Sequence, residues 1–220
     1  MAVVCYLSFP KSKNRRLVEA QAELEESIRH YGHEPLGFPS GKSLQIFGEV
    51  LAHARACSRG GAFVWCNTDV KLVRDPCDVP DAQSVFGFRR TEVPSGEICL
   101  GVDMYYIPTA LWDSYLAGDI PRLYLGASYV DRWMEVSVRS VACYRDLDGY
   151  IEHKTHERSD ASGSDRNKYY QRNFRSFNAW AKRRGFDPIP APHFLLPWLG
   201  HVWGVRDAVA KTIRILKDKK

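Results

Sequence analysis

Short apolar runs alternate with amphipathic segments over the first third of the chain, and this alternation restricts the fold more than any other feature. Residues 2–9, AVVCYLSF, form a β-branched and aromatic run that stops at Pro10, which is typical of a buried strand. The segment at 15–32 is rich in good helix formers, ends at a glycine, and spaces its apolar residues as one face of a helix requires: Leu17, Ala20, Leu24 and Ile28. The chain therefore opens with a strand, a loop and a helix.

The same cycle follows once more. A short strand is predicted at 34–38, a Pro-Ser-Gly turn at 39–41, a second amphipathic helix at 43–57 and a strongly apolar strand at 62–66. Strands that alternate with helices in short cycles imply right-handed crossovers, so we predict an α/β domain with a mostly parallel central sheet flanked by helices. Ligands of such sheets bind at the carboxyl ends of the strands. That rule places three polar segments on one rim: 8–11 (SFPK), 40–43 (SGKS) and 67–69 (NTD).

The later half continues the pattern less regularly. Two strands are predicted at 84–90 and 99–108, followed by a helix that runs into another strand within 127–144. The polar, Gly/Ser-rich stretch at 160–168 predicts a mobile loop. Two more helices complete the prediction, at 167–185 and 205–220.

Composition limits the class of protein and its partners. With 220 residues, 45% of them hydrophobic, the chain can bury one sizeable core. We interpret residues 1–160 as that core and residues 161–220 as a helical extension packed on the same domain. The net charge of +5 is small, and the positive residues are scattered until the C-terminal tail. An extended nucleic-acid-binding surface is therefore not indicated. A phosphate-bearing ligand or an anionic surface suits this charge better.

The cysteines and the N-terminus indicate a reducing compartment. The six cysteines contain no Cys-x-x-Cys pair and no Cys/His cluster with zinc spacing, so we expect them to be reduced and mostly buried. No apolar run is long enough to span a membrane, and the N-terminus lacks a positive region ahead of its short apolar run. We therefore expect a protein made and kept in a cytoplasmic compartment.

The strand at 62–66 leads into three polar residues, Asn67, Thr68 and Asp69, after which the apolar path resumes with VKLV. Asn and Asp after a strand are also ordinary turn residues, because they hydrogen-bond their own backbone. The resumed apolar path favours more strand over a reversal of the chain. A carboxylate at a sheet rim can hold a divalent cation, and a cation there can hold a diphosphate.

The segment GFPSGKS at 37–43 invites comparison with a phosphate-binding P-loop. That motif needs four residues between its first glycine and Gly-Lys-Ser, whereas this segment has three, because Leu36 takes the place of the first glycine. A true P-loop is therefore disfavoured. Lys42 at a helix start would still suit phosphate binding, and the alternative is an ordinary helix cap formed by Ser40 or Ser43.

Several motifs, in order, resemble a known family. The strand and loop ending at Pro10, the Gly-Lys-Ser helix start, the apolar helix and the stretch GGAFVWCNTDV look like the first half of a GT-A nucleotide-sugar glycosyltransferase, whose families end the same strand in Asp-x-Asp. GFRRTEV and GVDMYYIP are similar to the Gly-Arg-Arg and Gly-x-Asp-x-Phe-x-x-Pro segments of small glycosyltransferase-like proteins. YVDRWMEVSVR resembles an acidic segment before a helix ending in arginine, and IEHKTHERSD a late His-containing segment that completes a metal site. The resemblance covers residues 2–160 and implies a single GT-A-like domain.

This resemblance implies a chemistry and a set of residues. It implies that a sugar passes from a nucleoside-diphosphate sugar, with UDP favoured, to a hydroxyl of a glycan or glycoprotein acceptor, with Mn²⁺ or Mg²⁺ as cofactor. The metal ligands would be Asp69, His153 and His156. The catalytic base of an inverting transfer would be Asp131, with Asp103 as the second candidate. The residues expected around the donor are Ser8, Phe9, Pro10, Lys11, Lys42, Asn67, Thr68, Asp69, Arg89 and Arg90.

Two positions depart from the family's pattern. Asn67 stands where the motif has its first acid, and an amide is a poorer metal ligand, so Asp69 becomes the main carboxylate. Val130 replaces the first acid of a Glu-Asp pair, which keeps Asp131, the acid that the family comparison casts as the base in inverting enzymes. A noncatalytic nucleotide-sugar-binding module is therefore the alternative to an enzyme.

Several charged side chains keep a second interpretation. Asp131 at a helix start is also a favourable charge for the helix dipole. His153 and His156 would share one face of a helix but lie on opposite faces of a strand. On a strand, only one of them could bind the metal ion. Asp103 lies between apolar residues on a predicted strand, so it should meet a sugar hydroxyl or a cation. Arg89 and Arg90 alternate across a strand, so one of them faces the rim.

The aromatic residues are assigned to the core. Trp112 and Trp133 more often fill a core than stack on a sugar. Aromatic and basic residues are interleaved at 167–185, which suits nucleic-acid stacking, but one helical stripe predicts packing against the sheet instead: Tyr170, Phe174, Phe177 and Ala181. The basic closing helix is consistent with, at most, peripheral contact with an anionic membrane.

Overall fold

The computed structural model describes residues 2–8, 14–39, 45–59, 61–125, 129–141, 143–154 and 164–187; the side chains of residues 100 and 164–168 are not described. The chain divides into two compact units, residues 1–180 and 181–220. Five of the predicted site residues and the closing helix lie outside the described residues: Phe9, Pro10, Lys11, Lys42, His156 and the segment 205–220.

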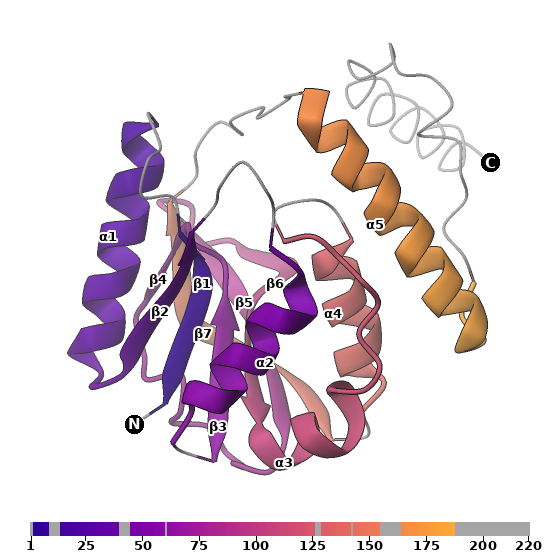
Figure 1. Ribbon diagram of the computed structural model, residues 1–220. Helices are drawn as coiled ribbons and strands as arrows, with labels where there is room; N and C mark the ends of the chain where they lie inside the picture. Colours follow the sequence, from indigo (N-terminus) through magenta and orange to yellow (C-terminus); the bar gives the residue numbers. More distant parts are fainter. Residues whose placement is uncertain are drawn as a thin grey trace, which may run out of the picture. The chain divides into compact units, whose positions relative to one another are not determined.

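A seven-stranded sheet forms the centre of the first unit (Figure 1). Its order is β2 (Glu34–Pro39), β1 (Val3–Ser8), β3 (Ala62–Cys66), β6 (Ile98–Pro108), β5 (Val85–Val93), β7 (Tyr144–Lys154) and β4 (Val70–Leu72). β1 runs parallel to β2 and β3, and β5 runs parallel to β7. The three other pairs, β3 with β6, β5 with β6 and β4 with β7, are antiparallel.

The predicted α/β class is confirmed, but the sheet is mixed rather than mostly parallel. Its first three strands are parallel because α1 and α2 separate them in sequence and allow crossovers. β5 ends at Val93 and β6 begins at Ile98, and so short a connection can only reverse the chain. The β5–β6 pairing is therefore antiparallel. β6 also pairs antiparallel with β3, and these two pairings bring the middle of the sequence to the centre of the sheet.

The helices are α1 (Arg15–His30), α2 (Phe47–Cys57), the short α3 (Thr109–Leu111), which continues as the π-helical turn η1 (Trp112–Leu116), α4 (Val130–Arg139) and α5 (Ser164–Arg183). Two predicted boundaries are wrong. α2 begins at Phe47 with Ile46 as its N-cap rather than at residue 43, because the chain there pairs Ile46 with Tyr124 in an isolated bridge. The two serines proposed as caps, Ser40 and Ser43, lie outside the described residues. α5 begins at Ser164, so the end of the predicted 160–168 loop is helical.

Both faces of the sheet are covered. Alternate residues of β1 and β3, among them Val4 and Val64, pack with Leu24 and Ile28 of α1. The opposite face carries an aromatic cluster in which Phe47 of α2 meets Trp65 of β3 edge to face, with ring centroids 5.2 Å apart, and Trp133 of α4 at 6.0 Å. Trp112 and Trp133 are buried, as the sequence predicts. Truncating one such ring to alanine typically costs about 3–5 kcal/mol.

Within the first unit, α5 buries a stripe made by Asn173, Phe177 and Trp180. The stripe packs on the segment around Tyr124 and Tyr129 rather than directly on a strand: the Asn173 side chain bonds both backbone polar groups of Tyr124, at 2.7 and 3.0 Å, and the Phe177 ring lies 5.8 Å from that of Tyr129. No helix in the described part of the chain is long and apolar enough to cross a membrane.

Candidate functional site

The segment after β3 turns at Thr68 and Asp69 and is held by hydrogen bonds on both sides. Thr68 is buried, and its hydroxyl donates a hydrogen bond to the Leu7 carbonyl at the end of β1. The backbone N–H of Asn67 donates to the carbonyl of Asp103 on β6 at 2.8 Å. The chain then enters β4 at Val70. Strand resumes at Val70 as predicted, but Thr68 and Asp69 form a turn and β4 runs opposite to β3, so the expected absence of a reversal is wrong. Asn67 and Asp69 lie beside the carboxyl ends of β1 and β3.

His153 on β7 lies next to Asp69. β4 and β7 pair with Val70 opposite His153, so the residue that precedes β4 is brought beside the histidine. The His153 Nε2 lies 3.4 Å from the Asp69 Oδ2. The histidine side chain is 7% exposed and that of Asp69 is 28% exposed, so the pair opens to solvent on the carboxylate side.

Glu92 holds the other side of the same ring. β5 and β7 pair with Glu92 opposite His153, and the His153 Nδ1 lies 2.8 Å from the Glu92 Oε2. Because an ionised carboxylate only accepts hydrogen bonds, the ring carries a proton on Nδ1. In the neutral ring, Nε2 then has its lone pair on the side of Asp69. This is the arrangement in which a carboxylate orients a histidine toward a metal ion.

Arg90 joins Glu92 to a buried acid on β6. Its Nε donates to Glu92 at 2.7 Å, and one terminal nitrogen donates to Asp103 Oδ2 at 2.8 Å. The other oxygen of Asp103 accepts from the Asn67 side-chain amide at 2.6 Å. Asp103 is 8% exposed, so it is a buried charge with a cationic partner, as its position on the strand predicts. We name the continuous polar chain the site network: Asn67, Asp103, Arg90, Glu92, His153 and Asp69.

Both arginines of the predicted donor site are paired with carboxylates. Arg89 forms two bonds of 2.6 Å with Asp148, and Arg90 lies between Glu92 and Asp103. The β5 register shifts between Phe88 and Arg90 against β7, and on both sides of Arg89 against β6. Such a bulge re-aims side chains next to functional sites. Here it is followed by two residues, Arg90 and Glu92, that both join the site network.

The electrostatics of the site network centre on Asp103. Burial raises the pKa of the Asp103 carboxyl and the charge of Asp69 raises it further, whereas Arg90 and the Asn67 amide oppose both effects. Burial disfavours the charged form of Arg90, but Asp103 and Glu92 outweigh it, so the pKa of the guanidinium lies above its ordinary value. Asp103 and Arg90 therefore each stabilise the charged form of the other against the cost of burial.

Asp131 contributes a further carboxylate to the same region. It lies in the first turn of α4, after Tyr129, which has a left-handed backbone with φ of 82°. Such strain in a residue with a side chain clusters at functional sites. The Asp131 side chain is accessible to water. Nevertheless, surrounding protein raises its pKa to about 6 by desolvation, with repulsion from Asp103 and Asp69 added.

The mutual repulsion shows that three carboxylates share one region. Asp69 and Asp103 both act on Asp131, and Asp69 acts on Asp103. Sequence reasoning selected these three residues and His153, and the structure brings them together. The sequence reasoning missed Glu92. The spacing could have indicated it, because Glu92 stands two residues after Arg90 and a strand places such residues on one face.

A separate cleft of about 530 Å³ lies beside α2. It is lined by residues from the end of β2, from the start of α2 and from the segment before α4: Phe38, Gln45, Ile46, Glu49, Val50, His53, Arg122 and Tyr124. None of the predicted site residues that the structure describes lines it. Phe38 lies near the carboxyl end of β2, beside Leu7 in the register with β1. The cleft therefore opens on the same edge of the parallel strands as Asn67.

Comparison with known proteins identifies the fold. No family model and no curated protein matches the sequence. S. aureus TarS 1-349 in complex with UDP-GlcNAc aligns with a TM-score of 0.51 over 93% of this chain and 73% of that chain, at 10% identity. A Drosophila beta-1,4-galactosyltransferase 7 mutant in complex with manganese, UDP-Gal and xylobiose aligns with a TM-score of 0.48 over 78% of this chain and 81% of that chain, at 9% identity. The chain has the GT-A-like fold of nucleotide-sugar glycosyltransferases.

Proposed function

We propose that this protein is a metal-assisted glycosyltransferase that moves a sugar from a nucleoside-diphosphate sugar to a hydroxyl acceptor. The fold supports a function related to nucleotide sugars. UDP is favoured as the nucleotide because the fold neighbour S. aureus TarS is a complex with UDP-GlcNAc. A glycan or glycoprotein is the class of acceptor, and the cytoplasm is the proposed compartment.

The observation that carries the proposal is the position of His153 between Glu92 and Asp69. Ligand atoms that share one divalent cation lie about 3 to 3.5 Å apart when each is about 2.1 Å from the ion. The 3.4 Å between His153 Nε2 and Asp69 Oδ2 fits that separation. The Glu92 carboxylate at Nδ1 fits the partner that metal-bound histidines have. We assign Asp69 and His153 as the cation ligands, with His156 as a further candidate.

The cation would neutralise charge on the departing diphosphate. The chain's own residues prepare the site for it. Asp103 accepts the Asn67 amide N–H, so the carbonyl oxygen of that amide is turned away from Asp103 and can accept from a donor hydroxyl. Arg90 offsets part of the negative charge of Glu92 and Asp103 beside the donor side, and it is held by both carboxylates rather than directed at a phosphate. Asn67 and Arg90 are therefore assigned to the donor side.

Asp131 is assigned as the base. In a single displacement the acceptor oxygen bonds to the anomeric carbon while the bond to the diphosphate breaks, and the diphosphate leaves with the electron pair. The acceptor's O–H proton passes to the Asp131 carboxylate. A pKa of about 6 suits this role, because the group is mostly ionised near neutral pH yet basic enough to take a proton. Inversion at the anomeric carbon follows from the single displacement.

A second candidate function is a noncatalytic nucleotide-sugar-binding module. Asn67 favours it, because the amide is engaged with Asp103 and supplies no carboxylate at the position where the resembling family has an acid. Such a module would bind the nucleotide without a requirement for a cation. It would also give no product from any donor.

The experiment is a survey of donor turnover. Purified protein is incubated with UDP- and GDP-sugars, with Mn²⁺ or with a chelator, and release of UDP or GDP to water or to simple glycosides is measured. We expect release from a subset of donors with Mn²⁺ only. Asp131→Asn should abolish release, whereas Glu135→Gln, an exposed acid on the same helix that pairs with Arg132 and Arg139, should not. Nucleotide binding without turnover in every condition would favour the binding module.

A further inference from the structure

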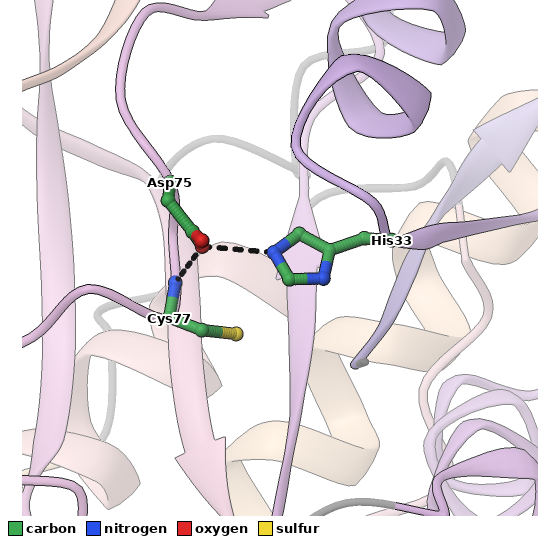
Figure 2. A group of neighbouring side chains, drawn as sticks. All are labelled: His33, Asp75 and Cys77. Atoms are coloured by element: carbon green, nitrogen blue, oxygen red, sulfur yellow. Dashed lines mark hydrogen bonds and ion pairs between the residues drawn. The ribbon is translucent and has the colours of Figure 1, made fainter.

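Three side chains of metal-binding type meet at the edge of the sheet opposite the site network. His33 stands directly before β2, and Asp75 and Cys77 lie in the loop after β4. β1 and β2 are parallel, and Ala2, which precedes β1, contacts the His33 ring, so this group lies at the amino end of the parallel strands. The site network lies at their carboxyl end. We name the group the edge triad: His33, Asp75 and Cys77 (Figure 2).

One ligand atom from each member lies within 4.8 Å of the two others. The His33 Nε2 is 2.8 Å from the Asp75 Oδ1, and Figure 2 shows the carboxylate between the imidazole ring and Cys77. On a tetrahedral zinc ion, with bonds of about 2.0–2.3 Å, ligand atoms lie about 3.3–3.8 Å apart. To reach that spacing, the separations within the edge triad would have to change by at most about 1 Å.

The loop holds its two ligands in place. The same Asp75 oxygen accepts the Cys77 backbone N–H at 2.7 Å, which closes a short Asx turn. Pro76 stands between them and is buried, and its ring fixes the backbone torsion while restricting the residue before it. Asp75 and Cys77 are therefore presented together with little freedom to separate.

A purely structural role explains only part of this arrangement. The Asx turn and the bond to His33 use the carboxylate and the imidazole, and neither involves the thiol. Among the described residues, Cys77 Sγ makes no hydrogen bond. Cys77 is half buried and packs beside the apolar cluster of α1 and the sheet, a place that a small apolar residue would fill as well. The thiol within reach of an imidazole and a carboxylate is what remains to be explained.

We propose that the edge triad binds a divalent cation of the zinc class. A thiolate with an imidazole selects borderline-soft ions such as Zn²⁺ or Co²⁺ over Mg²⁺ and Mn²⁺, whereas the Asp69 and His153 pair lacks sulfur. Binding releases the thiol proton. The proton that His33 now donates to Asp75 from Nε2 moves to Nδ1, and the Ala2 N–H, at 3.3 Å from Nδ1, turns away. Three protein ligands leave one position for water or another ligand.

The test uses Co²⁺ as a coloured substitute for zinc on the reduced, untagged full chain after chelator treatment. We expect a thiolate-to-cobalt charge-transfer band that saturates stoichiometrically and disappears on addition of Zn²⁺ but not of Mn²⁺. Cys77→Ser should lose the band. Cys57→Ser is the matched control and should keep the band. Cys57 also has a histidine beside it, the His53 Nε2 at 3.5 Å, but the described residues place no carboxylate close enough to complete a triad there.

A second variant guards against loss of the fold. Asp75→Asn keeps an oxygen that can accept the Cys77 N–H and so preserves the turn, but it removes the charge, and we expect Co²⁺ to bind at least about tenfold more weakly. No band in the wild-type chain, a band that survives Cys77→Ser, or unchanged affinity in Asp75→Asn would each overturn the proposal. Cation binding at the Asp69 and His153 pair gives no thiolate band, so failure here leaves the proposed glycosyltransferase function intact.

Discussion

The Nε2 of His153 lies 3.4 Å from the Asp69 carboxylate because β7 pairs with the strand that Asp69 leads into. Strand pairing, rather than nearness in sequence, therefore creates the candidate cation site. The same strand brings Glu92 to the far side of the ring through its pairing with β5. One histidine thus links a partly exposed acid to a buried polar network.

Removing the proposed base should separate binding from turnover. Asp131→Asn keeps the size of the side chain but cannot take a proton, so we expect the transfer rate to fall about 10²–10⁴-fold with donor affinity unchanged. In the wild-type chain the rate should rise as the pH rises through about 6, because the base must be ionised. Glu135→Gln should keep both the rate and its pH profile. A normal rate in Asp131→Asn would remove this residue from the mechanism.

The same carboxylate should lower stability at neutral pH. Its folded pKa of about 6 is above the ordinary aspartate value of 3.8, so between these two pH values the folded state holds a proton that the unfolded chain has already lost. The free energy of unfolding should therefore decrease as the pH rises through this window. Asp131→Asn should show a smaller decrease and should be no less stable than the wild type at neutral pH. Thermal unfolding across this range measures both, and a variant that is less stable there would contradict the argument.

The buried ion pair should be far more important for stability than the partly exposed one. Asp103→Ala leaves Arg90 and the Asn67 amide without their buried partner, and we expect a loss of about 3–5 kcal/mol in the free energy of unfolding. Asp148→Ala is the matched control, since Arg89 is more exposed and should cost about 1 kcal/mol or less. Urea unfolding measures the difference. Equal losses for the two variants would mean that Asp103 is not the centre of the network.

Glu92 should act on the cation through His153. Glu92→Gln weakens the hold on the ring's Nδ1 proton, so we expect Mn²⁺ to bind about 10–100-fold more weakly while the fold is kept. Glu97→Gln changes an exposed acid in the same hairpin and should leave Mn²⁺ affinity unchanged. Binding is read by paramagnetic resonance of Mn²⁺ without any substrate, so the result does not depend on knowing the acceptor. Equal affinities in the two variants would dissociate Glu92 from the site.

Local sequence patterns predict much of the architecture. The apolar run at 62–66 and the spacing of Leu24 and Ile28 predict β3 and α1, because burial on one face is a local property. The direction of a strand is not a local property: the short connection makes β5 and β6 antiparallel, whereas the antiparallel pairing of β6 with β3 depends on the arrangement of the whole sheet. The start of α2 was also missed, because Ile46 pairs with Tyr124, a partner far away in the sequence.

In the candidate site, too, the sequence predicts local features but not the contacts between distant segments. Asn67, Asp69 and Asp103 are recognisable from the sequence because a polar residue within an apolar strand needs a partner. The identity of that partner is not recognisable. Asp103 meets Arg90, and Glu92 meets His153, only because of the bulge in β5 and the pairing of β7. The edge triad escaped the sequence analysis as well, because His33 and Asp75 come from distant segments and the cysteines lack zinc-finger spacing.

The most direct measurement is a calorimetric titration of UDP into the wild-type chain and into Asp69→Asn, with and without Mn²⁺. Asp78→Asn, an exposed acid in the loop after β4, is the control. The account predicts Mn²⁺-dependent binding that Asp69→Asn abolishes and Asp78→Asn retains. Binding of UDP that is equally strong without Mn²⁺, or that survives Asp69→Asn, would contradict it.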